Sequence, residues 1–527
     1  MKTKAKIAGF IIVVLIAALI IIRFFVSGKF TNNEQQMEQA TINIQNKEKD
    51  IRQPAVAGQF YPENKEELEA MINEYLAEVK TQNFQGVIQQ IIVPHAGYIY
   101  SGKVAAYGFN QLKNAKFKRA VIIGRSHNNL FSGVAADDHS VWLTPLGKVK
   151  VDKDFINLLK STTLTVFIDS TPHEEEHSLE VMVPFLIKTL GPEIKIVPLL
   201  FGDNREEDIS ALGQALGKIL DKSTVIIISS DLSHYPTYSD AQNLDQKTIA
   251  AILENDVSKF QKKIAELESL GIKQVATLAC AEPAIAAGLV LAKNLGFKSH
   301  LLKYANSGDY FPESKDRVVG YAAIAFENPN FDKLEEDILS AFKRELNKEE
   351  QKIALKIARQ TLEAAFEKKD YNYEPEINSY PIFRIPRGAF VTLRKDGKLR
   401  GCIGAFEPKE SLAEVIKEMA LSAAFHDPRF LPLTQEELDK VKIEISVLSP
   451  REKINNPDAI ELGKHGVYIQ RGTNSGTFLP QVATEEGWGK ETFLNNLCKE
   501  KAGLEEGCWK DSSTDLYIFT AQIFEEE

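Results

Sequence analysis

Cysteine is scarce in this 527-residue chain. Its four cysteines, Cys280, Cys402, Cys498 and Cys508, are too few to staple a protein of this size, and no C-x-x-C pair is present to hold a structural zinc ion. We therefore expect folding not to depend on a disulfide framework. Cys498 and Cys508 are near enough in sequence to form a local pair, but we favour the interpretation that both are small buried hydrophobic side chains without a role.

The chain also lacks a dense stretch of positive charge outside its extreme N-terminus. Its net charge is −10, which argues against a nucleic acid as partner because phosphate-backbone binding requires clustered Lys and Arg. Hydrophobic residues make up 44% and charged residues 26%, the balance of a globular protein with sizeable cores. The length fits two domains of ordinary size behind a separate N-terminal segment.

That N-terminal segment contains the longest hydrophobic run. Lysines at positions 2, 4 and 6 precede the apolar stretch from Ile7 to Val26, which is interrupted only by Arg23. A run of 20 residues matches the thickness of a bilayer core as a helix, and it exceeds the hydrophobic region of a cleaved signal peptide. No A-x-A cleavage site follows it. We expect an uncleaved membrane anchor in residues 1–30 and a polar stalk in residues 31–50.

The lysines before the run outnumber the basic residues after it, Arg23 and Lys29. Because basic flanks stay on the cytoplasmic side, this asymmetry predicts a single-pass membrane protein with its N-terminus in the cytoplasm. Both domains would then lie outside the cytoplasm.

Residues 51–327 alternate between short β-branched runs and amphipathic segments. This pattern predicts an α/β domain with a mostly parallel sheet covered by helices on both faces. We predict strands at Val87–Val93, Ala120–Ile123, Ile194–Phe201 and Val225–Ile228, and helices at Lys65–Lys80, Leu179–Leu190, Ile209–Leu220, Leu244–Glu254 and Ala284–Leu295.

Three of these strands end in residues that carry chemistry. One strand leads into His95, the next into His127, and a third into Asp231 with His234 three residues further on. Side chains that follow the carboxyl ends of parallel strands converge on one crevice. Seven of the nine histidines of the chain lie in this domain, so we predict a metal or acid/base site there.

The segment from His173 to His177 matches the H-E-x-x-H pattern of zinc proteases. That motif belongs inside an amphipathic helix, whereas this segment directly follows Pro172 and contains three consecutive glutamates. We therefore disfavour the protease hypothesis. We expect instead a loop that carries His177, together with Glu176 and Glu180, towards the crevice.

Several strings in this domain resemble the Memo family. They are PHAGYIYSG (94–102), GRSHN (124–128), EHSLEVMVPFL (176–186), SSDLSHY (229–235) and YANSGD (304–309). The resemblance implies a fold like that of the class III extradiol dioxygenases and a redox metal, copper or iron. It implies His95, His127 and Cys280 as metal ligands, with Asp231 and His234 as an acid/base pair beside the metal.

Two imidazoles and a thiolate suit Cu, Fe or, less well, Zn, and are poor ligands for Mg or Ca. One feature departs from the family pattern, which has glycine after the cysteine and proline four positions on. Here Cys280 is followed by Ala281, Glu282 and then Pro283, one residue shorter. Glu282 is therefore the alternative third ligand, completing a set of two histidines and one carboxylate.

The remainder of the chain predicts a connector, residues 328–346, and a second mixed α/β domain, residues 347–527. The amphipathic stretch Phe331–Phe342 predicts a connecting helix. Asn347 with Glu350 predicts a helix start with a reciprocal cap, extending to about Phe366. Further strands are expected at Gly388–Arg394, Val441–Leu448 and Gly466–Arg471, and further helices at Ser411–Ala424 and Lys490–Ala502.

The second domain contains strings that resemble the AMMECR family: LRGCIGAF (399–406), SAAFHDPRFLPL (422–433), GVYIQRG (466–472) and FLPQVATEEGWGKETFLNNLCKEKAGL (478–504). Arg400 and Cys402, flanked by Gly401 and Gly404, could form a nucleophile or a ligand-binding turn, with His426 as a candidate base. The alternative is that the glycines allow close backbone approach and Cys402 fills a small space.

Together the two resemblances indicate a fusion of the kind found in the AmmeMemoRadiSam system. The chain has no C-x-x-x-C-x-x-C cluster motif, so radical chemistry would belong to a separate radical SAM partner. We expect a metal-dependent redox or dioxygenase-like site in the first domain. The alternative is a module that binds a peptide or small ligand in the same crevice without chemistry.

Overall fold

A computed structural model of the chain describes residues 50–526 except 81, 335–337, 374–376, 378–379, 407 and 512. The expected membrane anchor and nearly all of the stalk lie outside these residues. Among the residues described, no helix combines the length and apolar character needed to cross a bilayer. The chain divides into two compact units, Met1–Arg52, which ends in the two-residue strand β1 (Ile51–Arg52), and Gln53–Glu527.

The first domain is built on a mixed β-sheet with the order β5-β6-β8-β3-β9-β2-β11-β10. The strands are β2 (Val87–Val93), β3 (Arg119–Arg125), β5 (Val141–Thr144), β6 (Gly147–Val151), β8 (Lys195–Phe201), β9 (Thr224–Ser229), β10 (Lys298–Asn306) and β11 (Gly320–Asn328). In addition, β4 (Val134–Ala136) pairs with β8, and β7 (Val166–Ile168) pairs with β4. The four predicted strands are confirmed as β2, β3, β8 and β9.

The sheet is mixed with a parallel centre, so the expectation of a mostly parallel sheet is confirmed only in part. Strands β6, β8, β3, β9 and β2 run parallel, whereas β5, β11 and β10 pair antiparallel with their neighbours. Two residues join β5 to β6, a connection too short for the crossover that parallel strands require. Strand β5 buries only alternate residues, whereas β11 is buried along its whole length.

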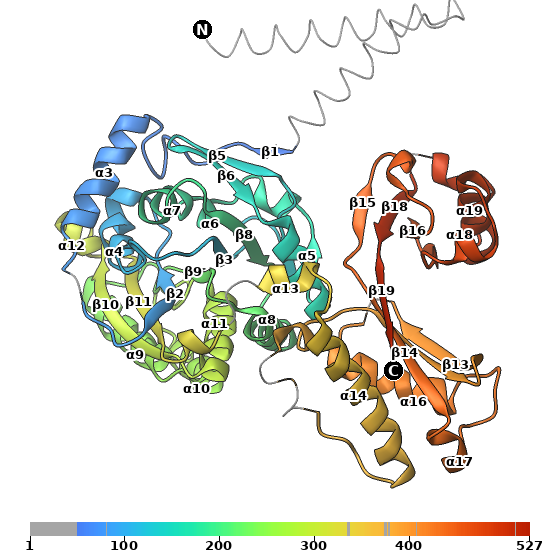
Figure 1. The fold of residues 1–527 in the computed structure, drawn as a ribbon. Coiled ribbons are helices and arrows are strands. Elements are labelled where there is room, and N and C mark those ends of the chain that lie inside the picture. The colour runs from blue at the N-terminus through green and yellow to red at the C-terminus, as the bar shows by residue number, and fades with distance from the viewer. Residues whose placement is uncertain are drawn as a thin grey trace, which may run out of the picture. The chain divides into compact units, whose positions relative to one another are not determined.

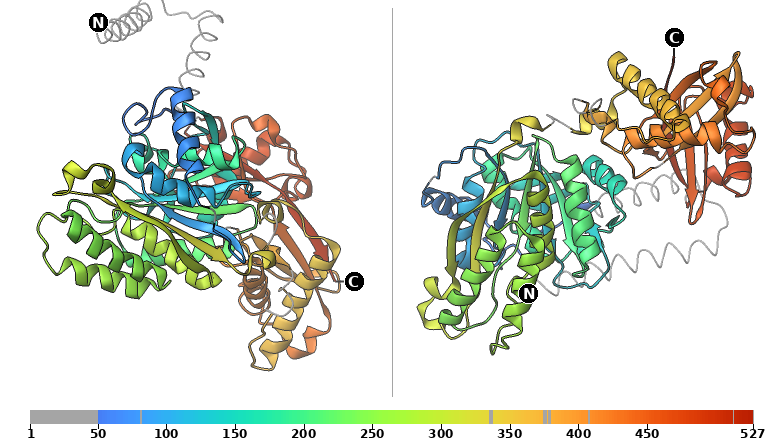
Figure 2. Two further views of the ribbon diagram at one scale, coloured as in Figure 1. Left: turned by 90° about the vertical axis from the view of Figure 1, so that its left-hand side faces the viewer. Right: turned by 90° about the horizontal axis from the view of Figure 1, so that it is seen from below.

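Helices cover both faces of the sheet, as expected (Figure 1). Helices α3 (Lys65–Ala77), α4 (Tyr98–Asn110), α6 (His177–Glu180) and α7 (Val183–Leu190) lie on one side, and α8 (Glu206–Ile219), α9 (Tyr238–Leu253), α10 (Val257–Glu268) and α11 (Glu282–Leu295) on the other. Figure 2 shows α9 and α10 in green outside the yellow strands β10 and β11. The short α5 (Lys153–Thr162) and α12 (Ser307–Tyr310) complete the domain.

Glycine permits a close approach between a helix and a strand in this domain. A Cβ atom on Gly288 would lie 2.0 Å from Cδ1 of Ile228, so α11 can rest directly on β9 only because Gly288 has no side chain. This packing fixes the start of α11, where Glu282 lies, relative to the end of β9, where Asp231 follows.

The second domain contains two antiparallel four-stranded sheets. One has the order β13-β12-β14-β19 and the other β15-β18-β16-β17. The strands are β12 (Ala389–Lys395), β13 (Lys398–Ala405), β14 (Val441–Leu448), β15 (Glu452–Ile454), β16 (Gly466–Arg471), β17 (Asn474–Phe478), β18 (Asp515–Phe519) and β19 (Ala521–Glu525). The three predicted strands of this domain are confirmed as β12, β14 and β16.

The helices of the second domain are α14 (Lys348–Phe366), α16 (Leu412–Phe425), α17 (Gln435–Leu438), α18 (Val482–Glu485) and α19 (Lys490–Asn496). Asn347 caps α14 in the predicted reciprocal arrangement with Glu350. Helix α16 packs on β12 and β13 and against α14. The predicted connecting helix is wrong as a continuous element, because the structure has a 3-10 turn at Phe331–Lys333 and a separate α13 at Ile338–Lys343.

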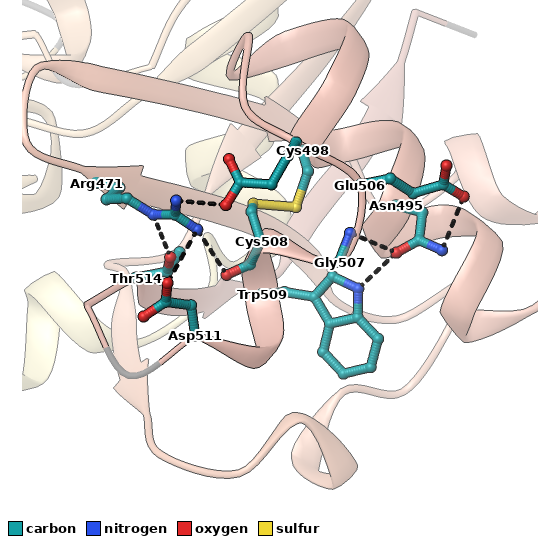
Figure 3. Close-up of a disulfide and its surroundings, with 10 residues drawn as sticks. Arg471, Asn495, Cys498, Glu506, Gly507, Cys508, Trp509, Asp511 and Thr514 are labelled. Carbon is teal, nitrogen blue, oxygen red and sulfur yellow. Dashed lines mark hydrogen bonds and ion pairs between the residues drawn. A yellow bond between two sulfur atoms is a disulfide. The ribbon is translucent and has the colours of Figure 1, made fainter.

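Cys498 and Cys508 form a disulfide, which corrects the expectation that they are unpaired (Figure 3). Helix α19 continues as a π-helical turn, Leu497–Lys501, that carries Cys498. Their Cα atoms lie 5.9 Å apart and both residues are buried. Beside the bond, Arg471 donates from Nη2 to the carbonyl oxygen of Cys508 (3.2 Å), and Trp509 donates from Nε1 to Oδ1 of Asn495 (2.8 Å).

Candidate metal centre

His95 follows β2 and Pro94, and only 1% of it is exposed. Its backbone amide donates to Oδ1 of Asp231 at 2.8 Å. Its Nδ1 lies 2.9 Å from Oγ of Ser229, and that hydroxyl donates its own hydrogen to the carbonyl oxygen of Ser178 at 2.6 Å. Ser229 must therefore accept from Nδ1–H, which leaves the lone pair of Nε2 free. Nε2 is buried and has no hydrogen-bond partner among the described residues.

His127 follows β3 and is fixed by Glu176. Its backbone amide donates to Oε2 of Glu176 at 2.7 Å, and its Nδ1 lies 2.9 Å from Oε1. Its Nε2 lies 3.0 Å from Sγ of Cys280. Burial would lower the pKa of His127, but the hydrogen bonds with Cys280 and Glu176 raise it to about 10.

His177 joins His95 and His127 at the first position of α6. One ligand atom from each of the three imidazoles lies within 4.8 Å of the other two, so the three together could hold a metal ion. The ring centroids are 4.4 Å apart for His127 and His177 and 5.4 Å apart for His95 and His177. Burial and the charge of His95 lower the pKa of His177 to about 3, so its imidazole is neutral near pH 7.

Cys280 is a free, buried cysteine beside these imidazoles. Its amide donates to the carbonyl oxygen of Asp231 at 3.1 Å, which ties the cysteine loop to the end of β9. Burial would raise the pKa of the Cys280 thiol, but the charge of His95 and the hydrogen bonds from His127 and His234 lower it to about 4. The sulfur is therefore a thiolate near neutral pH, the form that binds metals.

Glu282, the alternative third ligand, is the first residue of α11. Burial and the neighbouring charge of Glu268 raise its pKa. Among the described residues, the grouping of ligand atoms adds His177 to His95 and His127, and it includes neither Cys280 nor Glu282.

Asp231 and His234 lie together beside the imidazoles. Oδ2 of Asp231 is 3.6 Å from Nε2 of His234 and 4.0 Å from Nε2 of His95. Burial would raise the pKa of Asp231, but the charge of His95 and the contact with His234 lower it to about 2. Burial would lower the pKa of His234, but Asp231 and Cys280 raise it to about 10. This pair can hold a proton within reach of a ligand bound at the imidazoles.

The H-E-x-x-H segment does not form the helix that a zinc protease needs. His173 lies in a 3-10 turn, is fully buried, and has its Nε2 3.1 Å from the carbonyl oxygen of Ala135. Glu176 and His177 do face the crevice. Glu180 does not, because it binds the amides of Ala55 and Val56 and the hydroxyl of Tyr61.

Arg400 and Cys402 lie on strand β13, which corrects the expectation of a turn. The amide of Cys402 donates to Oδ2 of Asp427 at 2.8 Å, and the hydroxyl of Thr392 lies 3.2 Å from its sulfur. His426 is exposed at the end of α16. A Cβ atom on Gly401 would lie 2.1 Å from the carbonyl oxygen of Ala423, so this glycine is required for packing.

Sequence reasoning placed His95, His127, Cys280, Asp231 and His234 in one crevice, and the structure brings these five together. It missed two functions: His177 as a possible ligand, and Glu176 as the residue that orients His127. Both residues come directly before a predicted helix and face the histidines that follow the strands. That position could have indicated their roles.

Comparisons with known proteins match both domains. The Memo-like protein family matches residues 52–325, and the AMMECR1 family matches residues 355–524. A MEMO1 family protein of Nitrosopumilus maritimus is 38% identical over 283 residues, which cover 52% of this chain and 99% of that protein. One of Methanosarcina mazei is 37% identical over 284 residues, 53% of this chain and all of that protein.

Two further matches each cover a third of the chain. A protein of Nanoarchaeum equitans is 48% identical over 179 residues, which cover 33% of this chain and 98% of that protein. The crystal structure of an uncharacterized protein from Pyrococcus horikoshii is 39% identical and covers 33% of this chain and 90% of its own, with a TM-score of 0.30. This chain belongs to the Memo-like family and carries an AMMECR1 domain fused behind its Memo-like domain.

Proposed function

We propose that the Memo-like domain is a metal-dependent redox enzyme that uses iron or copper. The observation that carries this proposal is the buried Nε2 of His95, which has no hydrogen-bond partner among the described residues and faces two further imidazoles. A buried nitrogen left without a partner costs free energy, so its orientation towards other ligand atoms favours a bound cation.

The chemistry of the donors supports a transition metal. His95, His127 and Cys280 or His177 would hold it, a set of imidazoles and a thiolate that suits iron, copper or, less well, zinc. Alkaline-earth ions prefer oxygen ligands and fit poorly. When bound, such a metal would act as a Lewis acid and as a site for electron transfer to or from the substrate.

The residues beside the metal ligands would move protons. His234 is protonated near neutral pH because Asp231 and Cys280 stabilise its positive charge and raise its pKa to about 10. It can therefore donate a proton to a substrate oxygen, and Asp231 would stabilise and position the imidazolium. Asp231 also accepts from the amides of His95 and Ala96, which keeps its carboxylate fixed between the two histidines.

Metal analysis of the purified protein tests the proposal. Iron or copper should be present at about one ion per chain and should disappear in His95→Ala and His127→Ala. His300→Ala is the matched control, because His300 lies in the same domain and its Nε2 contacts Glu327 at 3.0 Å instead. A metal-free wild-type protein with full ligand affinity would favour the alternative, a binding module without chemistry.

We propose further that the chain is anchored by residues 7–26 with both domains outside the cytoplasm. The basic flank before the hydrophobic run supports this orientation. The Cys498–Cys508 disulfide supports it independently, because such bonds persist in oxidising compartments. A reporter fused after Glu527 tests the topology: a reporter active only in the cytoplasm should be silent.

A further inference from the structure

A buried tyrosine beside the metal centre has a hydroxyl that the fold does not use. Tyr321 is the second residue of β11 and only 2% of it is exposed. In the described part of the chain, no hydrogen bond engages its hydroxyl. Tyr98 is equally buried, at 3% exposed, yet its hydroxyl donates to the carbonyl oxygen of Val181 at 2.7 Å. Tyr321 therefore differs from Tyr98 in that no described protein group engages its hydroxyl.

The backbone places Tyr321 next to the acid/base pair. The amide of Leu232 donates to the carbonyl oxygen of Gly320, and the amide of Gly320 donates to that of Ser233, both at 2.8 Å. The start of β11 thus runs alongside the segment that contains Asp231 and His234. Because Tyr321 directly follows Gly320, it lies beside this segment.

Electrostatics agrees with this position. Burial first, and then the negative charge of Asp231, raise the pKa of Tyr321 above the ordinary value of a phenol; Tyr100 and Tyr310 add to the effect. The phenol therefore stays protonated at every physiological pH. It can donate a hydrogen bond but cannot serve as a base.

Tyr100 lies on the solvent side of this group. It is 39% exposed, and its ring lies 4.8 Å from that of Phe311. Tyr100 lies on α4, which packs against β11, the strand that carries Tyr321. The neighbourhood of Tyr321 therefore extends from the carboxylate of Asp231, 4.0 Å from Nε2 of His95, to a residue in contact with solvent.

A phenol hydroxyl that no protein group engages, next to the segment of Asp231 and His234, is available to donate a hydrogen bond to a ligand. We propose that the hydroxyl of Tyr321 donates a hydrogen bond to an anionic oxygen of the substrate, such as a carboxylate, phenolate or enolate oxygen, bound at the metal centre. This inference rests on the proposed function, and it adds the substrate class and a further ligand-contacting residue.

The test uses Tyr321→Phe in the full chain, with Tyr98→Phe as the matched control. Each variant loses one hydroxyl from a buried ring. The first probe is azide, a small anion that accepts hydrogen bonds, titrated into the metal-loaded protein and followed by its charge-transfer absorption. The second measurement is thermal unfolding.

We expect Tyr321→Phe to keep the metal content, to weaken azide binding by about fivefold to twentyfold, and to leave Tm unchanged or raised, since the fold loses no hydrogen bond. Tyr98→Phe should lower Tm by about 2–4 °C and bind azide like wild type. Unchanged azide affinity in Tyr321→Phe, or a loss of Tm equal to that of Tyr98→Phe, would overturn the inference.

Failure of the proposed function gives a different result. A wild-type protein that takes up no iron or copper shows no azide absorption in any variant, which contradicts the metal centre itself. The thermal comparison then decides the role of Tyr321 alone. A destabilised Tyr321→Phe would assign the hydroxyl to the fold, and an undestabilised one would support its assignment to a ligand.

Discussion

Glu176 holds His127 by two hydrogen bonds, one to the backbone amide (2.7 Å) and one to Nδ1 (2.9 Å). The hydrogen bond to Nδ1 fixes the tautomer of the imidazole, because Nδ1 carries the proton and Nε2 is left to face the candidate metal centre. Glu176 also accepts from the amide of Ser178 at 2.9 Å, and so it sets the start of α6 and the position of His177. One carboxylate therefore aligns two of the three imidazoles.

Replacing this carboxylate should weaken metal binding without removing a ligand. We expect Glu176→Gln to reduce metal affinity by about 10- to 100-fold, since an amide cannot accept from both the backbone and Nδ1 of His127 as a carboxylate does. Competition with a chelator measures the change. Glu175→Gln is the control, because Glu175 is exposed one residue away. Equal affinities in the two variants would contradict an orienting role for Glu176.

The identity of the third ligand can be separated from that of the first two. Cys280→Ser should abolish any sulfur-to-metal charge-transfer absorption if the thiolate is bound, while His177→Ala should leave that absorption in place. The opposite pattern, with no such band in wild type and loss of metal in His177→Ala, would assign the position to His177. Glu282→Gln should retain the metal in both cases. Loss of the metal from this variant would instead identify the Glu282 carboxylate as the third ligand.

Metal affinity should rise with pH. His127 has a pKa of about 10 in the metal-free protein, so it is protonated at pH 7 and must release that proton before Nε2 can bind a cation. Between pH 6 and 9 we expect about a tenfold gain in affinity per pH unit for this proton.

The other two donors should add nothing to that slope. The pKa of Cys280 is about 4 and that of His177 about 3, so both have already lost their protons. Chelator competition at several pH values measures the slope, and calorimetry in buffers of different ionisation enthalpy counts the protons released. A flat profile would show that His127 is neutral before the metal arrives.

The sequence predicts the centre of the fold better than its edges. The continuous apolar runs of β2, β3, β8 and β9 are visible because both faces of these strands are buried. Strands such as β5 and β6 bury one face or less. Which strands they pair with depends on tertiary contacts, which the local hydrophobic pattern of the sequence does not reveal. The sequence pattern did not predict β10 or β11, although β11 is buried along its whole length.

The candidate site follows a similar division. His95, His127, Asp231 and His234 can be found because each directly follows a strand, and parallel strands bring such positions together. His177 and Glu176 come from a connection after a 3-10 turn, so no strand end marks them. Tyr321 lies at the start of an antiparallel strand, and its unused hydroxyl is visible only once its surroundings are known.

The LRGCIG segment can be tested as a structural strand. Gly401→Ala should destabilise the second domain by several kcal/mol, because the new Cβ atom would clash with the carbonyl oxygen of Ala423 in α16. Cys402→Ala removes a side chain whose sulfur lies 3.2 Å from the hydroxyl of Thr392 and should cost about 1–2 kcal/mol. Denaturant unfolding measures both. Equal costs would contradict the packing role of Gly401.

The disulfide makes the stability of the second domain depend on redox conditions. Cys498 and Cys508 close a short loop around a buried cluster that includes Phe493 and Leu497. Loop closure of this size contributes about 3 kcal/mol, so a reductant should lower the unfolding temperature of the second domain and leave that of the first unchanged. Differential scanning calorimetry with and without dithiothreitol measures the shift.

The double variant Cys498→Ala, Cys508→Ala should unfold at the lower temperature whether or not the reductant is present, while Cys402→Ala should respond like wild type. If wild type itself ignores the reductant, the two cysteines do not stabilise this domain as a pair, and the support that the bond gives to an oxidising location is lost with it.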